Sequence, residues 1–78
     1  MNGLGKDKIA QAFGVFIRTA RENKGLYQAD IAGKIGVSRG YYAHIEGGTR
    51  DISLTLAVKI CRVLDLNLND FVEYSMQG

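Results

Sequence analysis

The chain holds few side chains of the kinds that carry out covalent or metal chemistry. His44 is its one histidine and Cys61 its one cysteine. A single cysteine cannot form an internal disulfide, and an isolated histidine cannot assemble a metal site. The sequence also shows no Ser, His and Asp set, no paired carboxylates in an apolar setting and no glycine loop that cradles phosphate. We therefore expect no enzyme, no metal, no cofactor and no small-molecule ligand, which leaves binding to a macromolecule.

Between Gln28 and Glu46, apolar residues recur at the spacing of a helix, with polar residues between them. The spacing predicts two short helices joined by a turn of three or four residues that contains Gly36. Ser38 then has the side chain of a helix N-cap. The residues expected to face inward are Ile31, Ile35, Val37, Tyr42 and Ile45. Outward residues at the start of the second helix can enter a DNA major groove, so the segment indicates a helix-turn-helix.

Apolar spacing predicts further helices around this segment. Gly14 stands inside the first of them, either to let another helix approach or as a tolerated residue. Residues 1–5 show no pattern and are expected to be a frayed start, which leaves residues 6–78 as one domain. The fold class we expect is all-α, a compact bundle without strands. Its five helices are predicted over residues 6–24, 28–35, 38–47, 53–64 and 68–74.

Charge is distributed unevenly along the chain. Residues 1–50 carry eight Lys or Arg against four Asp or Glu, whereas residues 51–78 carry two against four. The net charge of +2 says little about a partner, but a basic part and an acidic part favour two different tasks. The chain shows neither a leader nor an apolar run long enough to span a membrane, so we expect a cytoplasmic protein.

The chain resembles the Cro/CI-type helix-turn-helix regulators, also called the Xre family, from about Phe13 to Phe71. The matching residues are Gly25, Leu26, Gln28, Ile31, Ala32, Gly36, Val37, Ser38, Ile45, Glu46 and Gly48. The resemblance implies a lambda-repressor-like bundle that regulates transcription. Such a regulator, a repressor or a repressor and activator, binds double-stranded DNA as a homodimer on paired half-sites. The resemblance also implies a protein of prokaryotic, phage or plasmid origin that associates with the nucleoid.

The resemblance also implies roles for individual residues. Base-contacting positions are Arg39, Gly40, Ala43 and His44. Arg39 is the main reader, because its planar fork can bond guanine O6 and N7 together. His44 reaches a base edge or a phosphate, or it is a histidine at the surface or packed against a partner, without a DNA contact. Since Gly40 and Ala43 offer no polar group, part of the specificity is expected to come from DNA shape.

Other positions match backbone contacts and a structural pair. Gln28 opens the second helix, where its amide and the helix N-terminus favour a phosphate, so replacing it is expected to weaken all sites alike. The full set of expected backbone contacts is Gln28, Ser38, Tyr41, Thr49, Arg50, Lys34 and Tyr27. Arg21 and Glu46 match a pair that forms a buried ion bridge, which we expect to be structural.

Two departures from the family pattern stand out. Tyr27 replaces the usual Ser or Thr N-cap, so that cap is lost or replaced, and Tyr27 packs or meets phosphate instead. Ile52 stands where many members have proline. The form without proline is similar to the controller proteins of restriction–modification systems.

The C-terminal helix is expected to contribute a second task. Its apolar surface exceeds what one short helix needs, and the excess favours an isologous dimer interface over a purely internal core. The residues expected there are Leu64, Leu66, Leu68, Phe71, Val72 and Tyr74. A competing hypothesis keeps the fold but makes the chain an antitoxin-like or adaptor module that binds a protein.

Overall fold

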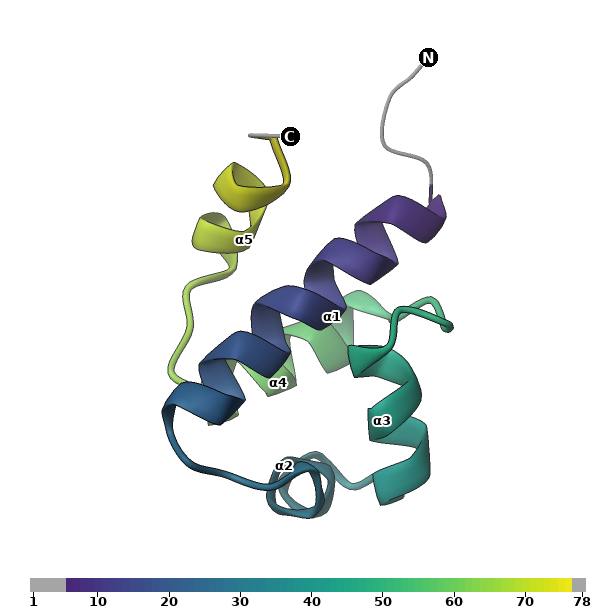
Figure 1. The fold of residues 1–78 in the computed structure, drawn as a ribbon, viewed down its shortest axis with the longest axis vertical. Coiled ribbons are helices and arrows are strands. Elements are labelled where there is room, and N and C mark those ends of the chain that lie inside the picture. Colours follow the sequence, from purple (N-terminus) through teal and green to yellow (C-terminus); the bar gives the residue numbers. More distant parts are fainter. Residues whose placement is uncertain (1–5, 77–78) are drawn as a thin grey trace.

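The computed structural model describes residues 6–76 (Figure 1). Over this range the chain forms five α-helices and no strand, which confirms the all-α expectation. The expectation for residues 1–5 lies outside the described range. The helices are α1 (Lys6–Asn23), α2 (Gln28–Ile35), α3 (Arg39–Glu46), α4 (Leu54–Val63) and α5 (Leu68–Met76).

Local signals in the sequence explain most of the helix ends. Gly36 closes α2 in the left-handed region, with φ of 79°, where a side chain would be strained. The hydroxyl of Ser38 accepts the Tyr41 N–H at 3.0 Å and starts α3. Ser53 does the same for α4 through the Leu56 N–H at 3.1 Å. Together these residues fix the turn between α2 and α3 and the entry to α4.

The start of α2 uses a different cap from the one the family pattern suggests. Tyr27 holds the N-cap position in extended backbone, and its side chain makes no capping bond. Instead the Asp30 carboxylate accepts the Tyr27 N–H at 2.8 Å, and the Asp30 N–H donates to the Tyr27 carbonyl at 3.0 Å. The lost hydroxyl cap is therefore replaced by an acid one turn into the helix. The Tyr27 side chain stays 77% exposed, so of the two expected alternatives packing is wrong, and the phosphate contact stays a prediction.

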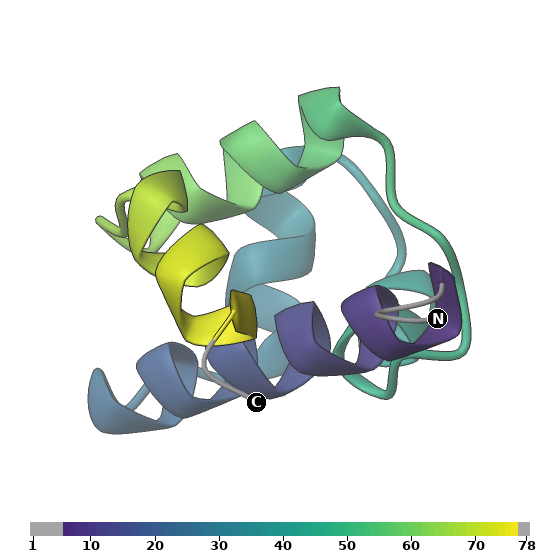
Figure 2. The same cartoon turned by 90° about the horizontal axis from the view of Figure 1, so that it is seen from above.

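The helices surround one core (Figure 2). α3 packs on α1 and α2, α4 packs on α2, and α5 packs on α1. Aromatic rings join α5 to α1, since Phe71 meets Phe13 edge-on at 5.1 Å between centroids and lies 5.5 Å from Phe16. The side chains expected to face inward from α2 and α3, namely Ile31, Ile35, Tyr42 and Ile45, are all buried.

Two glycines let α3 and its following loop approach α1. A Cβ on Gly14 would overlap the carbonyl oxygen of Glu46 and lie 2.8 Å from that of Ile45. A Cβ on Gly48 would lie 2.6 Å from the Cα of Gln11. Gly14 therefore permits a close helix crossing and is not merely tolerated.

The structure corrects part of the expected dimer surface. Leu64 is 0% exposed and Phe71 9%, so both belong to the core of the single chain, and Leu64 is not available to a partner. Leu66 and Leu68 are half-buried against the same core. Val72 and Tyr74 remain exposed, although the Tyr74 ring lies 5.8 Å from that of Phe16. Apolar spacing alone did not separate residues that face the core from those that face outward.

Candidate nucleic-acid interface

The helix α3 has one face in the core and one in solvent. Tyr42, Ile45 and Glu46 are buried, whereas the residues expected to read bases lie on the opposite side. Arg39, Gly40 and His44 are exposed and Ala43 is half-buried. Because the buried side packs α3 against α1 and α2, the backbone of the outward residues is held in a fixed position.

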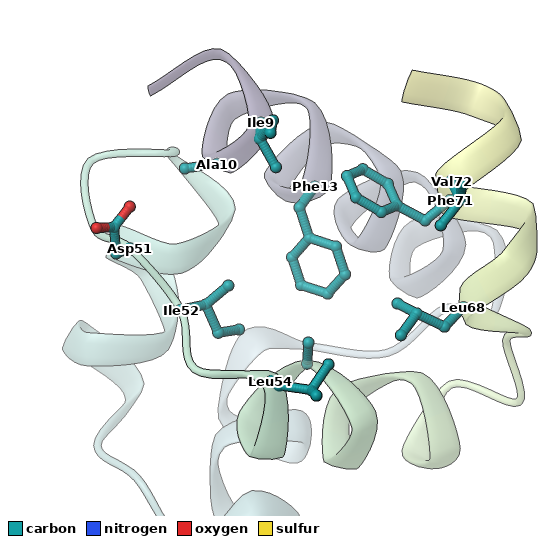
Figure 3. A pocket seen from close by; sticks show the side chains of 10 residues that line it. Ile9, Ala10, Phe13, Asp51, Ile52, Leu54, Leu68, Phe71 and Val72 are labelled. Carbon is teal, nitrogen blue, oxygen red and sulfur yellow. The ribbon is translucent and has the colours of Figure 1, made fainter. Parts of the chain in front are cut away.

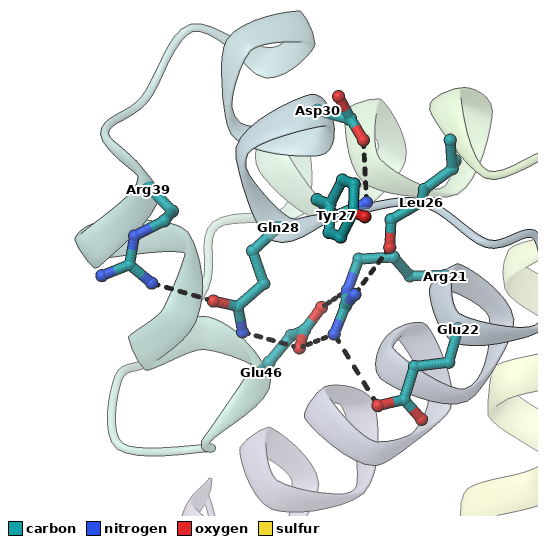
Figure 4. A network of polar contacts seen from close by, with 8 residues as sticks. All are labelled: Arg21, Glu22, Leu26, Tyr27, Gln28, Asp30, Arg39 and Glu46. Carbon is teal, nitrogen blue, oxygen red and sulfur yellow. Dashed lines mark hydrogen bonds and ion pairs between the residues drawn. The ribbon is translucent and has the colours of Figure 1, made fainter.

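A chain of hydrogen bonds runs from this outer face into the core (Figure 4). Arg39 donates through Nη1 to Gln28 Oε1 at 3.0 Å, and Gln28 Nε2 donates to Glu46 Oε1 at 3.1 Å. The Gln28 amide thereby links the start of α3 to its end. The two bonds use both polar atoms of the amide, so its orientation is fixed.

Arg21 anchors the inner end of this chain. Its Nε donates to Glu46 Oε2 at 2.6 Å, its Nη2 to Glu46 Oε1 at 3.1 Å, and its Nη1 to the Leu26 carbonyl at 2.8 Å. Burial by itself would raise the pKa of Glu46, but the bonds from Arg21 and Gln28 lower it below its ordinary value. The pair implied by the resemblance is present, and its partners keep both charges in place.

Tyr42 lies in the core beside the same carboxylate. Its hydroxyl is buried without a hydrogen-bond partner among the described residues. Burial and the nearby negative charge of Glu46 raise the pKa of Tyr42 above its ordinary value. Tyr42 therefore stays neutral and acts as core, not as a contact residue.

The loop after α3 is bonded back onto that helix. Thr49 Oγ1 donates to the His44 carbonyl at 3.3 Å, and the same oxygen lies 3.1 Å from His44 Nδ1. The hydroxyl proton can serve either of these two contacts, and both hold the loop against the end of α3.

A second contact joins the same loop to α3. The Arg50 guanidinium lies over the Tyr41 ring, 5.1 Å from its centroid. Tyr41 and Arg50 therefore form one unit beside the outer face, as do His44 and Thr49. The loop and α3 therefore present their polar groups on one surface. This was not predicted from the sequence, where each residue was assigned a separate role.

The remaining expected contact residues lie around this surface. Ser38 is exposed, but its hydroxyl is used to cap α3. Lys34 is exposed in the last turn of α2, and Tyr27 stands before the first. Asp30 was not expected to matter; the signal that could have revealed it is an acid three residues after the N-cap. All of these positions belong to the α2–α3 side of the molecule.

Other features of the described part of the chain concern metal ligands, membrane-spanning helices and the single cysteine. Residues 6–76 contain no group of three or more His, Cys, Asp or Glu side chains that could hold a metal ion. None of the helices described is long and apolar enough to cross a bilayer. Cys61 is buried, and burial raises the pKa of its thiol.

Comparison with known proteins agrees with this geometry. The helix-turn-helix family HTH_3 matches residues 17–71. A protein of Archaeoglobus fulgidus named as an uncharacterized HTH-type transcriptional regulator is 39% identical over 54 residues, which are 69% of this chain and 77% of that protein.

Solved structures of regulators share the fold. The clp gene regulator ClgR of Corynebacterium glutamicum superposes with a TM-score of 0.83 and 26% identity, over 88% of this chain and 73% of that one. The restriction–modification controller protein C.AhdI of Aeromonas hydrophila gives 0.74 and 32%, over 80% and 94%. A variant of the controller C.Esp1396I gives 0.77 at 23% identity, over 88% and 90%, a likeness of fold alone. The chain therefore belongs to the HTH_3 helix-turn-helix family, whose members here are transcriptional regulators and not enzymes.

Proposed function

We propose that this protein regulates transcription by binding a specific double-stranded DNA site as a homodimer. One observation carries the proposal: Arg39 is exposed at the start of α3 and is held there by Gln28, which is itself bonded to the buried Glu46. A reading residue placed in this way enters the groove in a defined orientation. The names of the similar gene regulator and controller proteins support the same role.

Direct base reading falls to two side chains. The Arg39 fork retains further N–H groups that can donate to guanine O6 and N7. His44 is exposed on the same face, and its ring nitrogen Nε2, which is not bonded to Thr49, is the polar group that it offers to a base edge or a phosphate. Gly40 and Ala43 let α3 come close to the DNA but offer no side-chain hydrogen bonds. The shape of the DNA therefore contributes to selectivity.

Phosphate contacts surround these readers. The Gln28 side chain with the N-terminus of α2 supplies one set of phosphate contacts, and the unit formed by Tyr41 and Arg50 supplies another. Thr49, Lys34, Ser38 and Tyr27 extend this contact surface. Such a protein acts in the cytoplasm on nucleoid DNA, as a repressor or as a repressor and activator.

Selection of bound sequences from random double-stranded DNA tests the proposal. We expect a two-fold symmetric site whose half-sites are about 34 Å apart. The Arg39→Ala variant should lose discrimination at one base pair of each half-site, by about 1–3 kcal/mol. Arg62→Ala removes the same charge from an exposed residue of α4 and should leave the preference unchanged.

Two results would count against this function. If the selection enriches no sequence, the protein is not a specific regulator. If the protein copurifies with a stoichiometric protein partner and binds DNA only in its presence, the antitoxin-like or adaptor hypothesis replaces it.

A further inference from the structure

Two of the outward residues of α3 carry no polar side-chain group. Gly40 is exposed and Ala43 is half-buried, and both lie within about one helical turn of Arg39. We call these two residues the Gly40/Ala43 patch. Because residues three apart on a helix are neighbours on its surface, the patch is continuous. It offers apolar surface and free space to whatever α3 binds.

The space above Gly40 is open. A Cβ placed on this residue would meet no atom within 4 Å. The long side chains on either side of the patch are held by other partners. Arg39 donates to Gln28 of α2 at 3.0 Å (Figure 4). His44 Nδ1 lies 3.1 Å from the hydroxyl of Thr49 in the following loop. The patch therefore lies accessible between two polar readers that are directed toward neighbours outside it.

One apolar group is available to such a patch in the major groove, the C5-methyl group of thymine. Adenine, guanine and cytosine present only hydrogen-bonding groups on that side. A patch without polar groups would cover the amino group of adenine or cytosine without replacing its bond to water, which is unfavourable. Burial of the thymine methyl against the same patch is favourable. The chemistry of the patch therefore selects a methyl group.

The place of this methyl group follows from the position of Arg39. A planar guanidinium pairs best with guanine O6 and N7, and the patch begins at the very next residue. Gly40 and Ala43 thus face the base pair beside that guanine. We propose that the Gly40/Ala43 patch recognises the C5-methyl group of a pyrimidine next to the guanine read by Arg39. This inference rests on the proposed function and specifies which group α3 reads without a hydrogen bond.

The patch is separate from the apolar interior of the molecule. An apolar cavity of about 410 Å³ lies between α1, α4, α5 and the loop that leads into α4 (Figure 3). None of the residues that line it belongs to α2 or α3. A substitution in the patch therefore does not alter this cavity, and its effect on DNA binding reports on α3.

The test removes the methyl group from the DNA. In the half-site that the wild type selects, the guanine in question is the one at which Arg39→Ala loses discrimination. Replacing the neighbouring thymine by uracil deletes only the methyl group and should weaken binding about fourfold, as expected for one buried methyl group. With cytosine at that position, 5-methylcytosine should bind more tightly than cytosine by a similar factor. Uracil in place of a thymine outside the half-sites is the control and should change nothing.

Variants of the protein test the same contact from the other side. Gly40→Ala adds a methyl group in open space, so α3 should stay folded, but that group occupies the place of the DNA methyl. The preference for thymine over uracil should fall from about fourfold to about one. Gly33→Ala is the matched control, since it makes the same change in open space on α2 and should keep the preference. Ala43→Ser, which adds a hydroxyl group to the patch, should also lower it, and circular dichroism checks that all three variants fold.

The outcomes separate this inference from the proposed function. A selected site that lacks thymine beside the guanine, or that binds equally well with uracil there, would overturn the inference and leave a sequence-specific regulator. Equal binding of cytosine and 5-methylcytosine, or a preference that Gly33→Ala lowers as much as Gly40→Ala, would overturn it as well. If the wild type enriches no sequence, the proposed function fails and this inference fails with it.

Discussion

Arg39 and Gln28 come from different helices, yet the guanidinium of the first donates to the side-chain carbonyl of the second at 3.0 Å. The same amide donates to the buried Glu46 at 3.1 Å. Gln28 therefore has two tasks at the proposed interface, a phosphate contact and the orientation of the main reader. Sequence reasoning assigned it only the first.

Replacing Gln28 by Ala should consequently do more than weaken all sites alike. We expect lower affinity together with reduced discrimination at the base pair read by Arg39, because the guanidinium loses its fixed partner. Binding to sites that differ only at that base pair measures the effect. Lys34→Ala is the control: it should weaken all sites equally and reduce the salt dependence by about one phosphate contact. Equal weakening by both variants would show that Gln28 does not orient Arg39.

The Gly14→Ala variant should be destabilised by about 1–3 kcal/mol, although alanine is the better helix former. The added methyl group meets the backbone carbonyls of Glu46 and Ile45, which cannot move without shifting α3. Gly33→Ala, in α2, has open space around the new methyl and should instead be stabilised by about 0.5–1 kcal/mol. Urea unfolding of the two variants compares them directly. Stabilisation of both would mean that the α1–α3 crossing is looser than the structure shows.

Asp65 follows α4 with φ of 57°, a left-handed conformation that L-residues adopt at a cost. Asp65→Gly should therefore stabilise the fold by about 1 kcal/mol. Asp65→Ala removes the same charge but keeps the side-chain penalty, so it should not stabilise. Thermal unfolding of the two variants separates conformation from charge. Equal stability of the Gly and Ala variants would exclude the conformational explanation.

The stability of the fold should depend on the ionisation of Glu46. Its folded-state pKa lies below the ordinary value of 4.5, so its contribution is complete above 4.5 and is lost as the pH falls through the folded value. Urea unfolding from neutral pH to well below 4.5 should show a steeper loss of stability for the wild type than for Glu46→Gln.

Two further variants keep this prediction testable. Breaking the pair in Glu46→Gln strands the Arg21 charge and should cost about 3–5 kcal/mol, so Arg21→Met/Glu46→Leu, which removes both charges, serves if the single variant does not fold. Glu22→Gln is the control, since Glu22 lies 3.9 Å from Arg21 with 61% of its side chain exposed. A Glu22→Gln profile that flattens as much as that of Glu46→Gln would contradict the assignment to Glu46.

The sequence predicted helix identities well because their ends carry local signals. Gly36, Ser38 and Ser53 each act on backbone groups within a few residues, and such effects can be read from the chain alone. The last helix extends past the expected Tyr74 to Met76. The cap at Tyr27 was uncertain because its replacement, Asp30, acts from inside the helix.

The sequence did not predict which residues of different helices lie close enough to contact each other. It predicted Gln28 and Arg39 as separate DNA contacts, since helical spacing says which way a residue points but not which neighbour it meets. The same limit affected Leu64, whose apolar character fits a core and an interface equally well. Its complete burial, and the exposure of Leu54 at the far end of α4, follow from how α4 and α5 pack on the remaining helices.

The division of α3 into a buried and an exposed side also bears on how such a protein changes over evolution. Gly40 and His44 lie in solvent and contribute nothing to the core, whereas Tyr42 and Ile45 hold the helix in place. Under the proposed function, mutations at the first two positions should redirect the protein to a new operator while leaving its folding unaffected. Arg39 is less easily replaced, because a new side chain at this position must also keep the hydrogen bond to Gln28. Divergence of binding sites among related regulators of this shape should therefore proceed first through the positions that share no hydrogen bond with α2.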